Sequence, residues 1–80
     1  MQPNLINYHD PNSILVINPI GKMRQVFTPF KVQVKEPTLL LDVNSWVVVD
    51  LVKASPTYKL MFRIGSNWYP YHLFRITIKF

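Results

Sequence analysis

The 80-residue chain contains no cysteine, which excludes two common ways of stabilising a small protein. Without thiols it can form neither a disulfide bond nor a thiolate metal site. It also has no apolar run near the ~20 residues that a membrane-spanning helix requires. No basic residue precedes Lys22 and no long apolar segment follows the start, so we expect neither a secretory signal nor membrane insertion. These absences predict a soluble, cytoplasmic protein.

Acidic residues, histidines and glycines are few, and their scarcity argues against catalysis. The chain has four carboxylates, one on each of four predicted elements: Asp10, Glu36, Asp42 and Asp50. The two histidines, His9 and His72, are too few for a metal site without help from Asp10. Two glycines cannot build a phosphate-binding loop. We therefore expect no enzyme activity, no catalytic residues, no metal and no cofactor.

Apolar and basic residues are plentiful. Hydrophobic residues make up 49% of the chain, which is enough for one core and argues against disorder of the whole chain. Nine Lys and Arg stand against four Asp and Glu, leaving a net charge of +5. This balance favours acidic partners such as nucleic acid or an acidic protein surface, although it can also serve solubility alone.

Seven prolines divide the chain into segments too short for ordinary helices. The segments alternate apolar and polar residues with the period of two that is typical of strands. In Trp46–Lys53 this alternation places Val47, Val49 and Leu51 on one face and Trp46, Val48, Asp50 and Val52 on the other. We predict five strands, the second of them bent or interrupted at Pro29: Ser13–Asn18, Met23–Lys35, Trp46–Lys53, Tyr58–Ile64 and Phe74–Phe80.

The predicted connections are short. Asn18-Pro19-Ile20-Gly21 suits a type I turn, and Gly65-Ser66-Asn67 has the composition of a hairpin reversal. Pro70 is followed by one short helical turn near Tyr71–Phe74, where we expect almost the only helix in the chain. Residues 1–12 are polar and aperiodic and predict an extended arm. This arm either frays or adds a strand to a neighbouring copy, which would make a homo-oligomer.

Residues 13–80 are expected to form a single domain, because strands this short cannot build two large sheets. One bent sheet closed into a small barrel would remove exposed edges. The fold prediction is therefore all-β, with five to six strands in a barrel of the Src homology 3-like or the oligonucleotide/oligosaccharide-binding type. The second type usually carries a helix between its third and fourth strands, and no segment here can supply it. The first type fits better.

The stretch from Leu39 to Ile76 resembles Src homology 3-like domains. The resemblance covers about half the chain and rests on the order of its parts: Asp42-Val43-Asn44-Ser45, Trp46–Lys53, Tyr58–Ile64, Gly65-Ser66-Asn67, Tyr69–Phe74 and Arg75–Lys79. The Trp68–Phe74 segment is also similar to the "WYPxxxF" ends of small barrels in bacterial and phage genomes. Between residue 13 and the turn at Asp42 the chain has one acidic residue, Glu36, and no Ala-Leu-Tyr-Asp-Tyr-like segment. The resemblance thus implies a fold and not the binding of proline-rich peptides.

Basic residues provide the first candidate site. By strand alternation, six of them point outward from three strands: Lys31, Lys35, Lys59, Arg63, Arg75 and Lys79. They either form a stripe for phosphates or for an acidic protein, or are dispersed over the surface, depending on strand order.

Aromatic residues provide the second candidate site. Adjacent residues of a strand face opposite sides, so Trp68, Tyr69, Tyr71 and His72 cannot all be core residues. Together with Trp46 they either form a partner-binding surface or cap the open end of a barrel.

The first functional hypothesis is a non-enzymatic protein-interaction module that uses these aromatic residues beside basic ones. Its small size and the resemblance to phage-encoded barrels suggest an accessory protein of a phage or mobile element that binds and modulates a host factor. The alternative is a nucleic-acid-binding barrel that uses its basic outer face, with aromatic rings stacking on bases.

Overall fold

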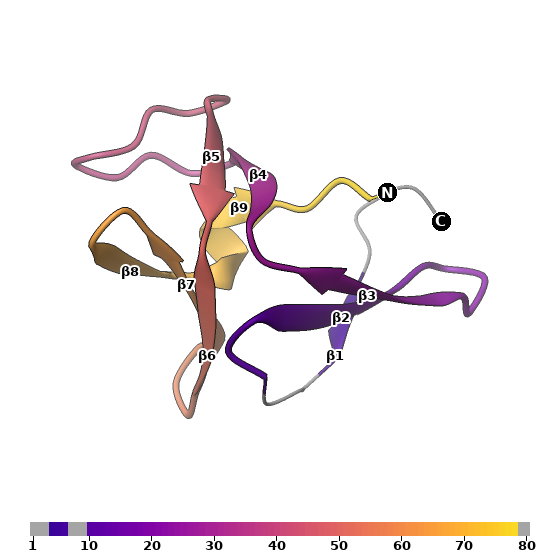
Figure 1. Cartoon of the computed structure of the whole chain (residues 1–80). Helices are drawn as coiled ribbons and strands as arrows, with labels where there is room; N and C mark the ends of the chain where they lie inside the picture. The colour runs from indigo at the N-terminus through magenta and orange to yellow at the C-terminus, as the bar shows by residue number, and fades with distance from the viewer. Residues whose placement is uncertain (1–3, 7–9, 79–80) are drawn as a thin grey trace.

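The chain folds as an all-β domain in the computed structural model, which describes residues 4–6 and 10–78 (Figure 1). The strands are β1 (Asn4–Ile6), β2 (Ser13–Ile17), β3 (Met23–Phe27), β4 (Phe30–Val34), β5 (Trp46–Val49), β6 (Leu51–Ser55), β7 (Lys59–Ile64), β8 (Asn67–Pro70) and β9 (Phe74–Arg75). One 3-10 turn, η1 (Tyr71–Leu73), follows β8. This turn and the all-β class confirm the predictions from sequence.

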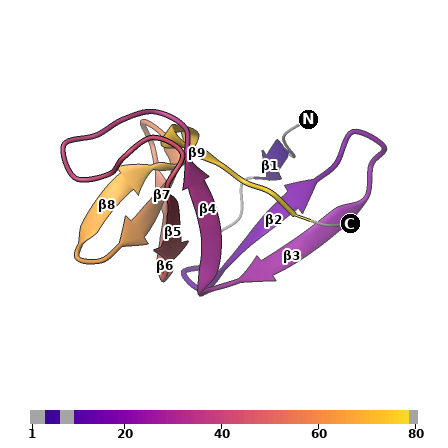
Figure 2. The same cartoon turned by 90° about the horizontal axis from the view of Figure 1, so that it is seen from above.

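The strands form three antiparallel sheets, and the chain passes from the first sheet to the second and from the second to the third at two short breaks, then returns to the second through η1. The sheet orders are β1-β2-β3, β5-β4-β9 and β6-β7-β8. Thr28 and Pro29 separate β3 from β4, and Asp50 alone separates β5 from β6. Seen from above, the β2–β3 hairpin extends away from the other two sheets (Figure 2). Residues 1–12 include β1, which pairs with β2 of its own chain.

The expectation of a closed barrel with five to six strands is wrong, because the three sheets do not join into a closed ladder. Pro29 has no N–H to donate, and pairing with the β2 side ends at Thr28, whose N–H donates to Asn12 O over 2.8 Å. Beyond Pro29 the chain pairs with β5 and β9 instead. The predicted strand Met23–Lys35 is therefore two strands in different sheets. Of the predicted last strand, the part that the structure describes, up to residue 78, is a strand only over Phe74–Arg75.

The alternation of inward and outward side chains shifts by one residue at Asp50. Asp50 N donates to Arg63 O over 3.0 Å, and Leu51 is also paired with Arg63, the two-against-one geometry of a β-bulge. Beyond the bulge Val52 is buried, whereas Leu51 is half-buried. The expectation that Leu51 shares a face with Val49, and Val52 with Trp46, is wrong because one extra residue shifts the alternation.

All three sheets contribute to one core. Its buried residues come from six strands or from the segment after β9: Ile14, Val16, Val32, Val34, Val49, Val52, Leu60, Phe62, Phe74 and Ile76. Phe62 meets Phe30 edge-to-face at 5.6 Å between ring centroids and lies 6.0 Å from Phe74. The burial of alternate residues in β4 and β7 confirms the predicted inward faces of those strands.

Gly65 adopts a backbone conformation that other residues rarely accept, with φ of 64° in the β7–β8 turn. A Cβ at this position would have no neighbour within 4 Å, so substitution changes only backbone strain. We expect Gly65→Ala to lower the free energy of unfolding by about 1–2 kcal/mol, measured by urea denaturation. Ser66→Ala, in the same turn, is the control and should change it by less than about 0.5 kcal/mol. An unchanged Gly65→Ala midpoint would contradict the left-handed assignment.

Candidate functional site

An apolar pocket lies between β8 and the loop that follows β4. It encloses about 430 Å³ and is lined by Thr38, Leu39, Leu40, Asn67, Trp68 and Tyr69. Two of these, Trp68 and Tyr69, belong to the aromatic segment singled out from the sequence. We call this feature the loop–β8 pocket.

The loop side of the pocket is a local turn organised by Thr38. Thr38 Oγ1 accepts the backbone N–H groups of Leu40 and Leu41, at 3.2 and 3.0 Å. Leu41 is half-buried and packs against the core, which anchors the turn. Leu39 and Leu40 are left outside, with exposed fractions of 105% and 69%. An exposed pair of leucines held by a hydrogen-bonded turn is unusual for a solvated loop and is typical of a contact surface.

The two aromatic residues of β8 have different roles because they lie on opposite faces of the strand. Tyr69 faces the core and meets Phe74 edge-to-face at 6.1 Å. Trp68 lies on the outer face, where Lys53 Nζ sits 4.3 Å from the centroid of its ring. A cation at this distance is attracted to the negative face of the indole. The pocket wall formed by Trp68 therefore has a positive charge beside it.

The other predicted aromatic residues do not join this pocket. Trp46, at the start of β5, is 55% exposed and pairs with Gln33 of β4. Tyr71 and His72 lie on η1, where His72 contacts Tyr71 and also Tyr58, with ring centroids 6.2 and 5.9 Å apart. The five residues proposed from sequence therefore separate into three groups, and only Trp68 and Tyr69 line the pocket.

The predicted basic residues are divided between two sheets. Lys31 and Arg75 share the outer face of β5-β4-β9, where Arg75 Nη1 donates to Gln33 Oε1 over 3.2 Å. Lys35, just beyond β4, is also exposed. Arg63 lies on the other sheet, paired with Asp50, and Lys59 begins β7 with φ of 71°. Lys79 lies outside the described residues.

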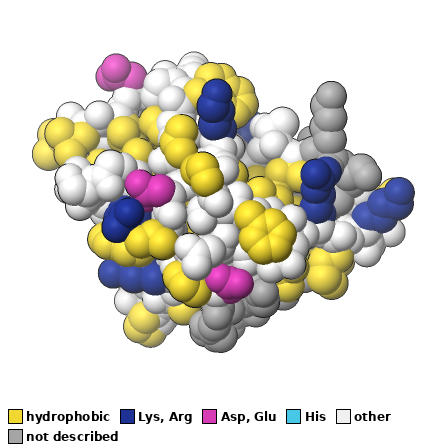
Figure 3. All heavy atoms as spheres, in the orientation of Figure 1, with side chains coloured by type: hydrophobic (Ala, Val, Ile, Leu, Met, Phe, Trp, Pro, Cys, Tyr) yellow, Lys and Arg dark blue, Asp and Glu magenta, His cyan; other side chains and the backbone are white. Residues whose placement is uncertain are grey.

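The face of the molecule seen in Figure 3 shows Lys and Arg side chains in separate places, with apolar surface between them. Of the two alternatives from sequence, a continuous basic stripe and a dispersed set of basic residues, this face agrees better with the dispersed set.

Sequence reasoning missed five residues of the site: Thr38, Leu39, Leu40 and Asn67, which line the pocket, and Lys53 beside it. A signal for the leucines was present, because Thr38-Leu39-Leu40-Leu41 is an apolar run between a proline and a polar turn, where a solvated loop would be polar. Lys53 carried no such signal. Its place beside Trp68 depends on the register of β6, β7 and β8, in which the two residues face the same side across β7, with Lys53 paired to Met61 and Trp68 paired to Arg63.

The ion pair beside the pocket is partly exposed. Arg63 Nε lies 3.0 Å from Asp50 Oδ1, and the two side chains are 37% and 41% exposed. Water and salt screen such a pair, so we expect Asp50→Asn to lower the free energy of unfolding by less than about 1 kcal/mol. The difference from the unmodified protein should shrink further in high salt, as measured by urea denaturation at low and high sodium chloride. A large, salt-independent loss would show instead that Asp50 is needed for the bulge itself.

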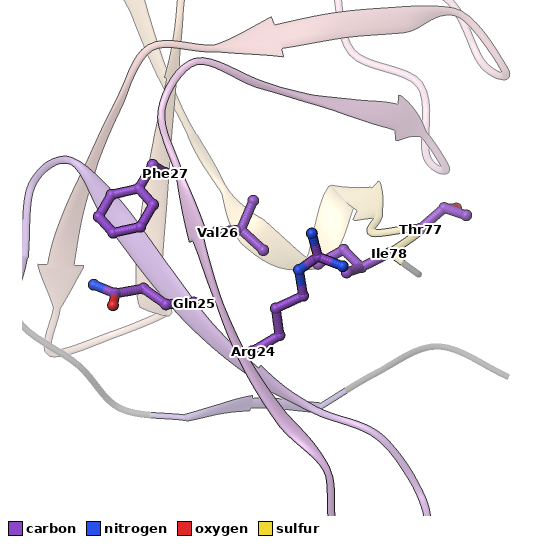
Figure 4. A pocket seen from close by; sticks show the side chains of 6 residues that line it. All are labelled: Arg24, Gln25, Val26, Phe27, Thr77 and Ile78. Atoms are coloured by element: carbon purple, nitrogen blue, oxygen red, sulfur yellow. The ribbon is translucent and has the colours of Figure 1, made fainter. Parts of the chain in front are cut away.

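A second hollow of about 350 Å³ lies between β3 and the segment after β9. Its lining is more polar: Arg24, Gln25, Val26, Phe27, Thr77 and Ile78 (Figure 4). The figure shows Arg24 and Val26 on the side of β3 toward Ile78, whereas Gln25 and Phe27 lie on the other side of the strand.

Within residues 10–78 no three His, Asp or Glu side chains are grouped so that they could hold a metal ion. None of the helices in the described part of the chain has the length and hydropathy to cross a membrane. In comparisons with known proteins, neither a family model, nor a curated protein, nor a solved structure matches this chain.

Proposed function

We propose that this chain is a non-enzymatic protein-interaction module that holds an apolar side chain of a partner protein in the loop–β8 pocket. The observation that carries the proposal is the exposure of Leu39 and Leu40 at the rim of a concave apolar site whose wall contains Trp68. Pockets that receive one anchoring side chain, and that include tryptophan, are typical centres of protein interfaces.

Charge favours an acidic partner. Lys53 lies against Trp68, and the chain as a whole carries a net charge of +5. A partner segment with one large apolar residue flanked by Asp or Glu would fill the pocket and meet positive charge around it. Such complementarity acts mainly on the rate of encounter and on selectivity between partners.

The finer expectations from sequence are part of this proposal. The described elements from β5 to β9, with a hairpin and a short 3-10 turn before the last strand, follow the order implied by the resemblance to Src homology 3-like domains. The proposed relationship is one of element order and not of a closed barrel. An accessory role in a phage or mobile element, acting on a host factor in the cytoplasm, is supported by the small size and by this resemblance.

Nucleic-acid binding is the second candidate, and one observation favours it. On the outer face of β5-β4-β9, Trp46 is exposed and pairs with Gln33 of β4; Lys31 lies two residues along β4, and Arg75 lies on the far side of Gln33, on β9. An exposed indole beside cations is the arrangement that stacks single-stranded bases in other small β-domains. This surface is separate from the loop–β8 pocket, so substitutions can test the two independently.

A peptide-display selection tests the proposal. Random peptides are selected on the unmodified protein, and the enriched ones are measured against Leu39→Ser/Leu40→Ser. We expect enriched peptides to carry an apolar residue flanked by acidic ones and to bind the double variant at least ~10-fold more weakly. Both leucines are exposed, so the variant should retain its stability to within about 1 kcal/mol. Equal binding to the variant would refute the assigned pocket.

An oligonucleotide titration tests the alternative in the same preparation. If a single-stranded DNA probe binds with an affinity that falls log-linearly with salt and is lost in Lys31→Ala/Arg75→Ala, the second candidate gains support. If the probe does not bind at moderate salt, the alternative is rejected. The displayed peptides should be unaffected by that double variant, apart from slower association.

A further inference from the structure

The outer face of the β2–β3 hairpin is apolar, although one face of a sheet at the edge of a small protein is normally solvated and polar. Alternation and register place six residues on this side of the hairpin: Ser13, which is already fully buried, and Leu15, Ile17, Met23, Gln25 and Phe27. We call it the hairpin face. Met23 and Phe27 are 58% and 62% exposed, and Leu15 and Ile17 are half-buried. The opposite face of the same hairpin carries the core residues Ile14 and Val16.

The hairpin face is distinct from both sites already described. It belongs to neither the loop–β8 pocket nor the outer face of β5-β4-β9, and the hairpin extends away from those sheets (Figure 2). In Figure 4, Gln25 and Phe27 lie on the opposite side of β3 from Ile78, although both border the hollow of about 350 Å³. The core of the domain therefore does not explain why this face is apolar.

We propose that the hairpin face is the contact between two copies of this chain, packed face to face around a two-fold axis at the level of Gln25. Met23 and Phe27 stand two residues before and two residues after Gln25, so antiparallel β3 strands place Met23 of each copy opposite Phe27 of the other. Leu15 pairs with Gln25 in the hairpin and lies at the same level. Gln25 Nε2 donates to Ser13 Oγ over 3.0 Å. Because this amide already has a hydrogen-bond partner within its own chain, burying it in a contact costs less free energy than burying an unpaired amide.

The charges of the hairpin fit a second copy in this orientation. Lys22 is exposed at the turn end, and Asp10 lies at the open end, where its Oδ1 accepts the Asn12 N–H over 2.8 Å. The antiparallel arrangement brings the turn end of each copy to the open end of the other, so each Lys22 approaches the opposite charge of Asp10. The two Lys22 residues lie about 20 Å apart, since six residues of strand separate them at ~3.4 Å each. This distance exceeds the screening length of ~8 Å in physiological salt.

The size of the face predicts a weak dimer. Strands β2 and β3 have five residues each, so the contact falls among interfaces smaller than the ~1,200 Å² of stable complexes. We expect self-association in the upper micromolar range, measured by sedimentation equilibrium from about 10 μM to about 1 mM, because dimer formation depends on protein concentration. The apparent mass should rise from 9.4 kDa toward twice that value.

Two sets of variants test the contact. Met23→Ser/Phe27→Ser should weaken dimerisation at least ~10-fold, whereas Val48→Ser, an exposed apolar residue on another sheet, should leave it unchanged. Because the chain has no cysteine, Gln25→Cys gives a single thiol close to the axis. A bis-maleimide that spans the ~10 Å between packed sheets should link two copies of this variant much faster than it links copies of the Lys31→Cys control.

Three results would overturn the proposal: a mass of 9.4 kDa at every concentration, association that persists in Met23→Ser/Phe27→Ser, or equal cross-linking of the two cysteine variants. A separate sedimentation assay with vesicles containing phosphatidylserine identifies a different occupant. If the protein stays monomeric in solution and Met23→Ser/Phe27→Ser abolishes sedimentation with these vesicles, the face binds lipid and the dimer is rejected.

Discussion

Replacing Phe62 with alanine is expected to lower the free energy of unfolding by about 3–5 kcal/mol, a large part of the total. Phe62 is fully buried, and its ring contacts those of Phe30 and Phe74 at the point where the sheets meet. Truncating a buried phenylalanine costs about 3–5 kcal/mol, because apolar burial is lost and a cavity remains. A domain of this length has a total stability of only about 4–12 kcal/mol.

The measurement is urea denaturation followed by circular dichroism and tryptophan fluorescence. Trp46→Ala is the control, because it also removes an aromatic side chain but from an exposed position, and it should cost less than about 1 kcal/mol. A similar loss in the two variants would contradict the position of the core described here.

The second large effect concerns Trp68. We expect Trp68→Ala to weaken binding of a peptide selected on the unmodified protein by at least ~30-fold, the size typical of a central interface residue. Trp68 forms a wall of the loop–β8 pocket, and its ring also holds Lys53 in place. Removing it eliminates both the apolar surface and the ordered positive charge.

Trp46→Ala is again the matched control, because Trp46 does not line the pocket. Dissociation constants are measured by isothermal titration calorimetry under conditions in which each variant is at least nine-tenths folded, so that loss of stability does not count as loss of affinity. If Trp46→Ala weakens peptide binding as much as Trp68→Ala, the partner site lies on the outer face of β5-β4-β9 instead.

Local alternation was sufficient to predict where most of the strands lie and most of the core, although it predicted neither β1 nor β8. Val32 and Val34 are buried between exposed Lys31 and Lys35, and Leu60 and Phe62 are buried in β7, because side chains of a strand alternate between the two faces wherever pairing is regular. The turn at Asn18–Gly21 was predictable for a similar local reason. Asn18 Oδ1 accepts the N–H groups of Ile20 and Lys22, at 3.2 and 2.8 Å, and Gly21 has φ of 90°.

The arrangement of the sheets could not be predicted in the same way, because it depends on which strands pair. The sequence marks Pro29 as an interruption but does not say that β3 and β4 belong to different sheets. The bulge at Asp50 was hidden by the otherwise regular Val47–Val49 alternation, since it forms only when two residues oppose Arg63. One extra residue in the strand was enough to exchange the predicted faces of Leu51 and Val52.

The candidate site was predicted only in part for the same reason. Trp68 was recognisable as an aromatic residue that a small core cannot absorb together with Tyr69. Its partners come from elsewhere in the chain: Leu39 and Leu40 from a loop about thirty residues earlier, and Lys53 from β6. The basic residues were correctly expected on outward positions of β4 and β9, but their division between sheets follows from strand order, which local patterns do not contain.

The central claim is that a partner protein is bound at the loop–β8 pocket. Its most direct test is a map of backbone amide chemical shifts during titration of the ¹⁵N-labelled protein with a selected acidic peptide. The account predicts that the largest changes fall on residues 38–41 and 67–69 and on the indole N–H of Trp68, with small changes on Lys31 and Arg75. Changes concentrated on β4 and β9 instead, with the loop and β8 unaffected, would contradict it.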